Sequence, residues 1–220
     1  MVNYKLYHYQ LCPFSRKVRI FLSEKNTKAD LAVENFWEKR QNFLALNPTG
    51  QIPVLLNYEN GKAICGSDII CEYLEEKHGG FRFFGDNPEA RAEVKRISRW
   101  FDEKFYHEVV KYVLHEKVIR FYQGAGYPRP EYIRTSKINL TYHLNYMKHL
   151  LKEQKWLAGN RISLADFSAA AQISVLDYLG HFPWQKSDVI KDWYMLIKSR
   201  PSFQPLLADY ISGFRPTTNY

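Results

Sequence analysis

The sequence QIPVLLNYENGKAICGS, residues 51–67, predicts two short strands followed by the start of a helix. Its two apolar runs are joined by a turn that contains Asn60-Gly61, a pair typical of β-hairpins because both residues tolerate positive φ. A helical pattern begins at Ser67, and Gly79 is a natural stop for it. The apolar side chains of this helix are expected to face inward: Ile69, Ile70, Tyr73 and Leu74.

Upstream of this stretch, short strand-like and helix-like segments alternate. YKLYHY, residues 4–9, alternates as a strand, and an amphipathic helix follows, with an apolar stripe on one face. A second strand is expected around residues 29–36, and a short helix around residues 38–46 ends before Pro48. The order strand, helix, strand, helix, strand, strand, helix predicts a small mixed α/β domain over residues 1–80.

Downstream, helical patterns replace the alternation, and we expect an all-helical domain over residues 87–220. Asn87 can cap a helix whose first residue is Pro88, and an apolar repeat continues for about thirty residues. In RISLADF, Ser163 and Asp166 have the spacing of a capping box. The apolar repeat consists of Val94, Ile97, Phe101, Phe105, Val109, Tyr112 and Val113.

Composition limits the classes of function. The 220 residues are 45% hydrophobic and 25% charged, as in ordinary soluble proteins, and carry a net charge of +8. Basic residues are interspersed with acidic ones, so we expect no nucleic-acid partner. We see neither a signal peptide nor a membrane-spanning run, and we expect a cytoplasmic protein without membrane insertion. The three cysteines have no zinc-like spacing, the seven histidines show no paired spacing, and no metal site is predicted.

The combination of Cys12-Pro13-Phe14-Ser15, NPTGQIPVL at 47–55 and SLADFSAA at 163–170 resembles the cytosolic glutathione transferase superfamily. The resemblance covers essentially the whole chain. It implies a thioredoxin-like N-terminal domain that holds glutathione, and a helical C-terminal domain that supplies much of the second substrate's pocket. It also implies a homodimer.

The resemblance identifies candidate site residues. It implies a catalytic role for Cys12 at the first helix start, where the helix dipole and the nearby Arg16, Lys17 and Arg19 would stabilise a thiolate. It implies that Pro53 follows a cis peptide bond, which leaves the Ile52 backbone free to pair with glutathione, and that Ser67 holds the γ-glutamyl carboxylate. The implied glutathione-binding residues are Phe14, Ser15, Ile52, Pro53, Ser67 and Asp68.

One position departs from the family pattern. Family members usually carry Glu or Asp immediately before the serine, whereas this chain has Gly66, and we therefore expect weak glutathione binding. In addition, ISVLDYLGHFPW and the segment that ends in ADYISGFRP resemble a bacterial branch of glutathione-transferase-like cell-division proteins that bind FtsZ.

Two classes of function remain open. One is an enzyme that transfers glutathione to small electrophiles or exchanges thiols with disulfides. The other is a non-catalytic FtsZ-binding adaptor whose tail, residues 213–220, contacts the partner.

Several individual residues also have a purely structural interpretation. Cys12 could be a small buried residue, and Cys65 and Cys71 are expected to fill the core. The aromatic residues Phe81, Phe83 and Phe84 could pack within a domain or contact a second subunit.

Overall fold

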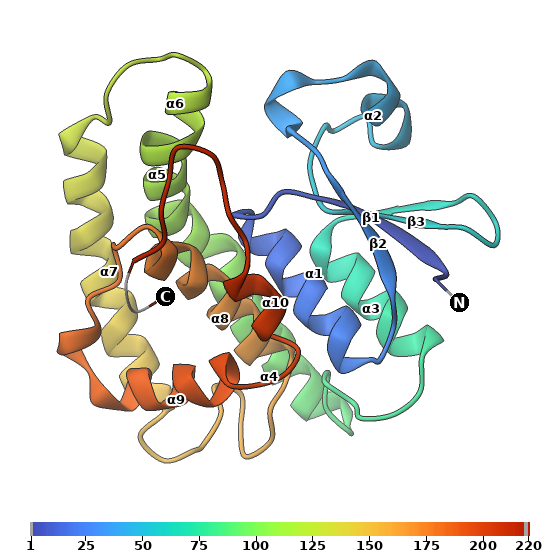
Figure 1. Cartoon of the computed structure of the whole chain (residues 1–220). Coiled ribbons are helices and arrows are strands. Elements are labelled where there is room, and N and C mark those ends of the chain that lie inside the picture. The colour runs from blue at the N-terminus through green and yellow to red at the C-terminus, as the bar shows by residue number, and fades with distance from the viewer. Residues whose placement is uncertain (1, 218–219) are drawn as a thin grey trace. The chain divides into compact units, whose positions relative to one another are not determined.

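The computed structural model describes residues 2–217 and 220 (Figure 1). The chain divides into two compact units. The first comprises Met1–Phe83 and Arg200–Ser212, and the second comprises Phe84–Ser199 and Gly213–Tyr220. The first unit contains the mixed sheet and the second is helical, which confirms the predicted fold class.

A four-stranded mixed sheet in the order β2-β1-β3-β4 forms the centre of the first unit. β1 pairs in parallel with β2 and antiparallel with β3, and β3 pairs antiparallel with β4. The strands are β1 (Tyr4–His8), β2 (Ala29–Val33), β3 (Val54–Asn57) and β4 (Ala63–Cys65). The helical segments are α1 (Pro13–Glu24), η1 (Phe36–Glu38), α2 (Gln41–Leu46) and α3 (Ser67–Lys77). This order confirms the predicted sequence of strands and helices.

The two faces of β1 carry different side chains. Tyr4 and Leu6 are buried on one face, which packs against α1 and α3; these helices contact each other (Figure 1). Tyr7, on the other face, lies 5.8 Å from Phe43 of α2, measured between ring centroids. The amphipathic pattern of α1 is also confirmed, because Val18 and Phe21 are fully buried.

The predicted hairpin is present: β3 and β4 pair antiparallel across a loop at 58–62, in which only Gly61 of the Asn60-Gly61 pair has a positive φ, 68°. Two local expectations about α3 were wrong. Ile69 is 56% exposed, since it lies on the outer face of α3. That helix ends at Lys77, where His78 adopts an extended backbone, so Gly79 does not terminate it.

The second unit begins with a continuous helical stretch over residues 88–122. Asn87 caps it by accepting a 2.8 Å hydrogen bond from the backbone N–H of Ala90, and Pro88 is the first helical residue, as predicted. Two stretches with π-type hydrogen bonding interrupt the α-helical pattern. The segments are α4 (Pro88–Arg99), η2 (Trp100–Val110), α5 (Lys111–Leu114), η3 (His115–Ile119) and α6 (Arg120–Tyr122).

The buried helix α8 (Leu164–Tyr178) packs against α4, η2 and α9 (Asp188–Lys198). Its predicted capping box is present, and the Ser163 backbone N–H donates to Asp166 Oδ2 at 2.9 Å. The same carboxylate accepts from Trp193 Nε1 at 3.0 Å. Asp166 therefore joins the start of α8 to α9. The remaining segments of this unit are α7 (Pro130–Leu150) and η4 (Trp184–Lys186).

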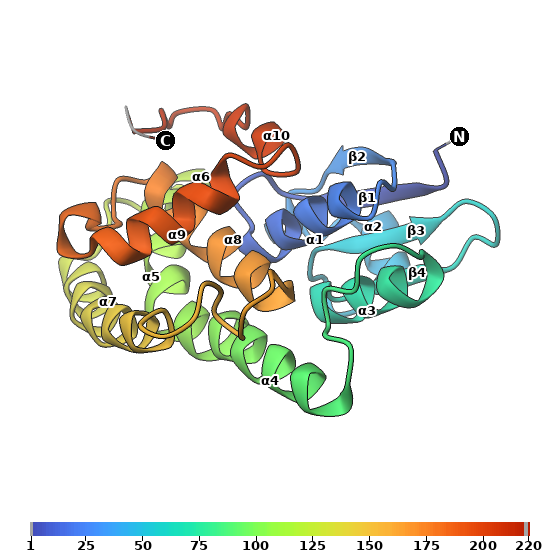
Figure 2. The same ribbon diagram turned by 90° about the horizontal axis from the view of Figure 1, so that it is seen from below.

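Residues 200–212, which include α10 (Gln204–Leu207), cluster with the first unit although the sequence places them after the helical pattern. Arg200 Nε donates to Glu24 Oε1 at 2.6 Å, and Asp209 accepts from Arg19 of α1 at 2.8 Å. Figure 2 shows this segment in red beside α1 and β2. Ion pairs to α1 thus attach the segment to the first unit.

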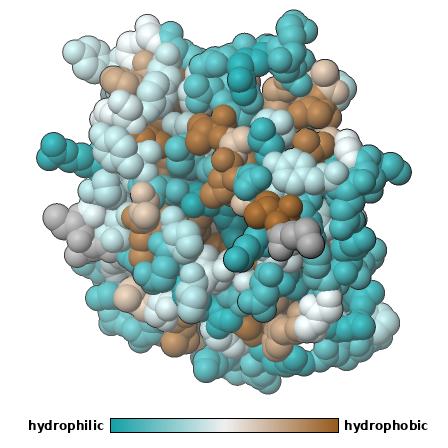
Figure 3. All heavy atoms as spheres, turned by 45° about the vertical axis from the view of Figure 1, so that its right-hand side comes forward, coloured by the Kyte–Doolittle hydropathy of each residue, from teal (hydrophilic) through white to brown (hydrophobic). Residues whose placement is uncertain are grey.

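On the face seen in Figure 3, hydrophobic residues form several small groups among hydrophilic ones. Within the described residues, no helix combines the length and apolar character that crossing a bilayer requires.

Candidate functional site

The topology of the sheet brings three separate sequence segments to one end. β1 runs antiparallel to β3, and Tyr7 near the end of β1 pairs with Val54 at the start of β3. Val54 also pairs with Cys65 at the end of β4. The segments that follow β1, precede β3 and follow β4 therefore lie at the same end of the sheet. They contain the predicted residues Cys12, Pro53 and Ser67.

Cys12 is the N-cap of α1, with an extended backbone (φ −76°, ψ 115°). Its N–H donates to the Tyr9 carbonyl oxygen at 3.0 Å, and its own carbonyl oxygen accepts from the Arg16 N–H at 3.0 Å. These bonds fix the sulfur-bearing residue at the helix start. The predicted position of Cys12 is therefore confirmed.

The predicted ionisation of Cys12 is not confirmed. Burial raises the pKa of the Cys12 thiol, and this outweighs the opposing effects of the Ser15 hydroxyl, the Ser15 and Phe14 backbone N–H groups and the Arg16 charge. Only 6% of Cys12 is exposed. The protonated thiol is therefore the favoured form at neutral pH.

Asp209 explains why the basic residues after Cys12 have less effect than the sequence suggested. Its carboxylate accepts from Arg19 Nη1 at 2.8 and 2.9 Å and from Arg16 Nη2 at 3.2 Å. Arg16 and Arg19 are thus paired with a carboxylate. Because 190 residues separate Arg19 from Asp209, no local sequence pattern indicates this pairing.

The Ile52–Pro53 peptide bond is cis, as the resemblance implied. The backbone N–H and C=O of Ile52 form no hydrogen bond with any other described residue. The Pro53 carbonyl oxygen accepts from the Gly66 N–H at 3.2 Å, which links this segment to the start of α3. The Ile52 backbone groups are therefore available to pair with a peptide-like ligand.

The start of α3 offers groups for an anion and for a cation. Ser67 is the first helical residue, and the N–H groups of a first turn lack partners within the helix. Asp68 is exposed in that turn, and its Oδ1 lies 3.3 Å from the position that a Cβ on Gly66 would occupy. A carboxylate is therefore present beside position 66, although the chain has glycine there.

Position 66 also differs from its neighbours in backbone conformation. Gly66 has φ 95° and ψ 135°, a backbone conformation that residues other than glycine rarely adopt. A larger residue at this position would be strained and would approach the Asp68 carboxylate.

His8 and Tyr9 lie at the same end of the sheet and were not identified from the sequence. Burial, Arg19 and Arg16 lower the pKa of His8 to about 4, so the ring is neutral at pH 7. Its Nδ1 atom is buried without a hydrogen-bond partner among the described residues. Tyr9 packs edge-on against Trp37, with 5.1 Å between ring centroids. No sequence pattern indicates that a single histidine at the end of a strand is buried next to the candidate site.

The other two cysteines are Cys65, at the end of β4, and Cys71, on α3. Cys71 is fully buried on α3, which fits the predicted core role, whereas Cys65 is half-buried with Sγ 3.8 Å from the Leu46 carbonyl oxygen. Burial raises the pKa of Cys65 as well. Cys12, Cys65 and Cys71 form no disulfide, and the described residues contain no cluster suited to a metal ion.

Phe83 packs inside the first unit rather than on its surface. Its ring lies 5.6 Å from that of Phe21, and its N–H donates to Glu75 Oε1 at 2.9 Å. Lys25 donates to the Phe81 carbonyl oxygen at 2.9 Å and pairs with Glu75 at 2.6 Å. This supports the packing interpretation for Phe83, while Phe81 is 41% exposed.

The C-terminal tail packs on its own helical unit. The Phe214 ring lies 5.2 Å from that of Phe121, and the Phe214 carbonyl oxygen accepts from Tyr178 Oη at 3.1 Å. Thr217 Oγ1 donates to the Asp177 carbonyl oxygen at 3.0 Å. Between these anchors, residues 215–216 are exposed, and residues 218–219 of the predicted partner-binding tail lie outside the described part.

Two family models match the chain. The model of the glutathione S-transferase N-terminal domain matches residues 6–82, and that of the C-terminal domain matches residues 114–209.

Whole-chain similarity extends to two kinds of relative. FtsZ-localized protein A of Caulobacter vibrioides is 41% identical over 221 residues, which cover 100% of this chain and 97% of that protein. Glutathione S-transferase 2 of Saccharomyces cerevisiae is 24% identical over 200 residues, which cover 89% of this chain and 85% of that protein.

Solved structures give the same two kinds of match. FzlA from C. crescentus superimposes with a TM-score of 0.96 at 40% identity, covering 99% of this chain and 97% of that one. A glutathione S-transferase from Rhodospirillum rubrum F11 gives a TM-score of 0.95 at 40% identity, covering 98% of this chain and 97% of that one.

Proposed function

Because the chain belongs to the glutathione S-transferase family, we propose that it uses this fold as a binding scaffold for FtsZ filaments, with thiol chemistry secondary. The observation that carries the proposal is the 41% identity to FtsZ-localized protein A along the whole chain. The buried Cys12, whose pKa is raised, supports it, because a transferase needs an accessible thiolate or an equivalent group.

The tail supplies a surface for this partner. Phe214 and Thr217 hold it on the helical unit, so Arg215 and Pro216 are presented in a fixed, exposed position. Little backbone conformational entropy is then lost when a partner binds them. Arginine is also enriched among residues that dominate binding energy.

We further propose a cytoplasmic homodimer, in which two tails per particle increase the avidity for a polymer. Sedimentation at micromolar concentration tests this part. A single species at the chain mass of 26.1 kDa would contradict it.

Co-sedimentation with GTP-polymerised FtsZ tests the binding proposal. The protein should pellet with polymer and stay soluble without it. Arg215→Glu should reduce the pelleted fraction, whereas Lys62→Glu, an equal charge change in the exposed β3–β4 loop, should not. Melting temperatures of both variants control for folding. A wild-type protein that remains in the supernatant would contradict the proposal.

Glutathione binding is the second candidate, and the convergence of Cys12, the Ile52 backbone and the start of α3 at one sheet end favours it. In this candidate the Ile52 backbone pairs with the peptide part of glutathione. The Ser67 hydroxyl and the N–H groups of α3 hold the γ-glutamyl carboxylate, and Asp68 accepts from the ammonium group.

Thiol exchange at this site would follow deprotonation of Cys12. The thiolate would attack one sulfur of a disulfide, form a mixed disulfide and release the other sulfur as a thiolate. Titration calorimetry with glutathione tests the binding step, and Asp68→Asn should weaken it while Glu76→Gln on the same helix should not. Equal affinities of the two variants would remove Asp68 from the site.

A further inference from the structure

A groove of the second unit lies between the end of the helical stretch 88–122, the α6–α7 loop and the start of the C-terminal tail. Its volume is about 550 Å³, within the range typical of ligand sites. The residues that line it include Lys117, Phe121, Tyr127, Gly213 and Phe214, but none of the candidate glutathione-binding residues. We call this feature the tail groove.

Aromatic side chains line the tail groove and remain exposed. Phe121 is 57% exposed and Tyr127 is 93% exposed. The Phe214 ring lies 5.2 Å from the Phe121 ring, beside α6, where Figure 1 shows the tail in dark red. Gly213 permits this approach, because a Cβ at that position would lie 3.1 Å from Phe121 Cε1. Exposed aromatic side chains that gather on one surface mark a site for another molecule.

The loop that carries Tyr127 is fixed at both ends. The Ala125 N–H donates to the Arg120 carbonyl oxygen at 2.9 Å, and the Arg129 N–H donates to Glu116 Oε2 at 3.0 Å. The backbone around Tyr127 is therefore held in place before a partner arrives, which lowers the entropic cost of binding.

Lys117 brings an uncompensated positive charge to the tail groove. It is half-buried, its Nζ donates to the Leu179 carbonyl oxygen at 3.0 Å, and it forms no ion pair with any described residue. Burial and the charge of Lys137 lower the pKa of Lys117, as expected for a cation that has no carboxylate beside it. A carboxylate placed in the groove would stabilise this ammonium group.

The neighbouring carboxylate of Glu116 does not compensate Lys117. It accepts from Arg129 Nη2 at 2.5 Å and lies 3.3 Å from Arg120 Nε. One carboxylate is therefore shared by two guanidinium groups, and the surroundings of the groove stay positive.

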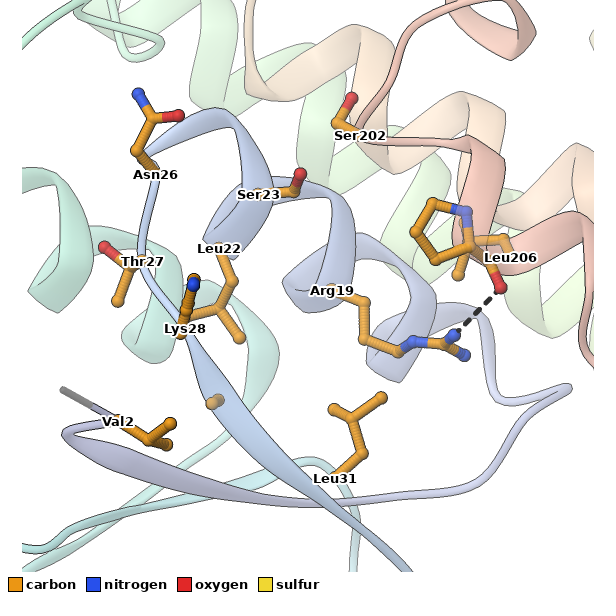
Figure 4. Close-up of a pocket in the computed structure, with 12 residues that line it drawn as sticks. Val2, Arg19, Leu22, Ser23, Asn26, Thr27, Lys28, Leu31, Ser202 and Leu206 are labelled. Atoms are coloured by element: carbon orange, nitrogen blue, oxygen red, sulfur yellow. Dashed lines mark hydrogen bonds between the residues drawn. The ribbon is translucent and has the colours of Figure 1, made fainter.

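A cavity of the first unit shows the opposite arrangement around one of its cations. Arg19 lines that cavity and donates to the Pro205 carbonyl oxygen at 3.3 Å (Figure 4). Its guanidinium group is also paired with Asp209 at 2.8 Å. The charge of Arg19 is thus compensated within the chain, whereas that of Lys117 is available for a carboxylate of another molecule.

We propose that the tail groove binds an acidic segment of the FtsZ partner, with a carboxylate toward Lys117 and an apolar side chain between Phe121 and Tyr127. The exposed Arg215 and Pro216 are the next residues of the tail and continue the same surface. The positive charge selects a carboxylate, and the aromatic walls select an apolar side chain next to it. This inference rests on the proposed function and adds the chemistry of the segment that is bound.

Co-sedimentation with GTP-polymerised FtsZ, over a range of FtsZ concentrations, tests the inference. Lys117→Met removes the charge, keeps an unbranched side chain and should raise the dissociation constant by at least about fivefold. Lys117→Arg retains the charge and should bind more tightly than Lys117→Met. Tyr127→Ala removes an exposed ring and should raise the dissociation constant by about tenfold.

Two substitutions in the β3–β4 loop are matched controls. Lys62→Met and Tyr58→Ala change exposed side chains of the same types and should bind FtsZ like the wild-type protein. Raising NaCl from about 50 to about 300 mM should weaken wild-type binding more steeply than binding by Lys117→Met, because salt screens the lost charge pair. Melting temperatures of all variants control for folding.

The outcomes separate this inference from the proposed function. Wild-type affinity in Lys117→Met or in Tyr127→Ala would overturn the inference, although the wild-type protein would still bind FtsZ. An equal loss of affinity in the two control variants would overturn it as well. A wild-type protein that does not pellet with polymer would contradict the proposed function itself.

Discussion

Asp209→Asn is the substitution for which the structure gives the clearest energetic expectation. The Asp209 carboxylate accepts from two guanidinium groups of α1, at 2.8 and 2.9 Å from Arg19 and at 3.2 Å from Arg16. The exposed fractions of these side chains are 0% for Arg16 and 8% each for Arg19 and Asp209. The substitution keeps the shape of the side chain but leaves two buried cations without their carboxylate.

The expected cost follows from this burial. Removing one partner of a buried ion pair typically costs about 3 to 5 kcal/mol, because the remaining charge is desolvated without compensation. We therefore expect the free energy of unfolding to fall by about 3 to 5 kcal/mol. Asp86→Asn is the matched control, since Asp86 pairs with Arg161 and both side chains are 57% exposed. An exposed pair of this kind contributes about 0 to 1 kcal/mol.

Equilibrium urea unfolding, followed by tryptophan fluorescence, measures both variants. The Asp209→Asn curve should shift to much lower urea, and its slope should fall if residues 200–212 detach from α1 in the native state. Arg19→Gln retains the Arg16–Asp209 pair, so it should lose less stability than Asp209→Asn. This variant replaces Asp209→Asn in the experiment if Asp209→Asn does not fold. A loss below about 1 kcal/mol for Asp209→Asn, or one equal to the control, would refute the reasoning.

Four further outcomes are expected. Iodoacetamide labelling of Cys12 should accelerate by roughly tenfold per pH unit between pH 7 and 9, because burial raises the thiol pKa; a rate that levels off below pH 8 would contradict this. Gly66→Ala should lower the free energy of unfolding by about 1 to 3 kcal/mol because of the positive φ, whereas Gly79→Ala should not, as compared by urea unfolding. Burial holds the pKa of His8 and His181 at about 4, so stability should decline between pH 6.5 and 4 as the unfolded chain alone takes up these protons; a double glutamine variant with the same pH slope would argue against it. Arg129 lowers the pKa of Glu116 to about 2, so stability should also fall between pH 4.5 and 2. Glu116→Gln should flatten that part of the curve of stability against pH, and an unchanged slope would show that another group is responsible.

Local patterns in the sequence predicted most of the fold. The cap at Asn87, the box at Ser163 and Asp166, and the buried stripe of α1 each depend on residues within one or two helical turns. Such interactions are determined by neighbours in the chain, so the sequence alone indicates them. The same reasoning misplaced Ile69, because periodicity identifies an apolar side chain but not whether another element covers it.

The electrostatics of the site could not be predicted in this way. The sequence places Arg16 and Arg19 near Cys12, yet their carboxylate partner is Asp209, far along the chain. The desolvation of Cys12 likewise depends on tertiary packing. The position of the thiol could therefore be predicted from the sequence, but the direction of its pKa shift could not.

The proposed function separates filament binding from thiol chemistry, and the affinity of Cys12→Ser for polymerised FtsZ tests that separation most directly. Co-sedimentation over a range of FtsZ concentrations should give wild-type and Cys12→Ser proteins the same dissociation constant within about twofold, with and without saturating glutathione. Loss of binding in Cys12→Ser would make the thiol part of the interaction, and absence of binding by the wild-type protein would contradict the account.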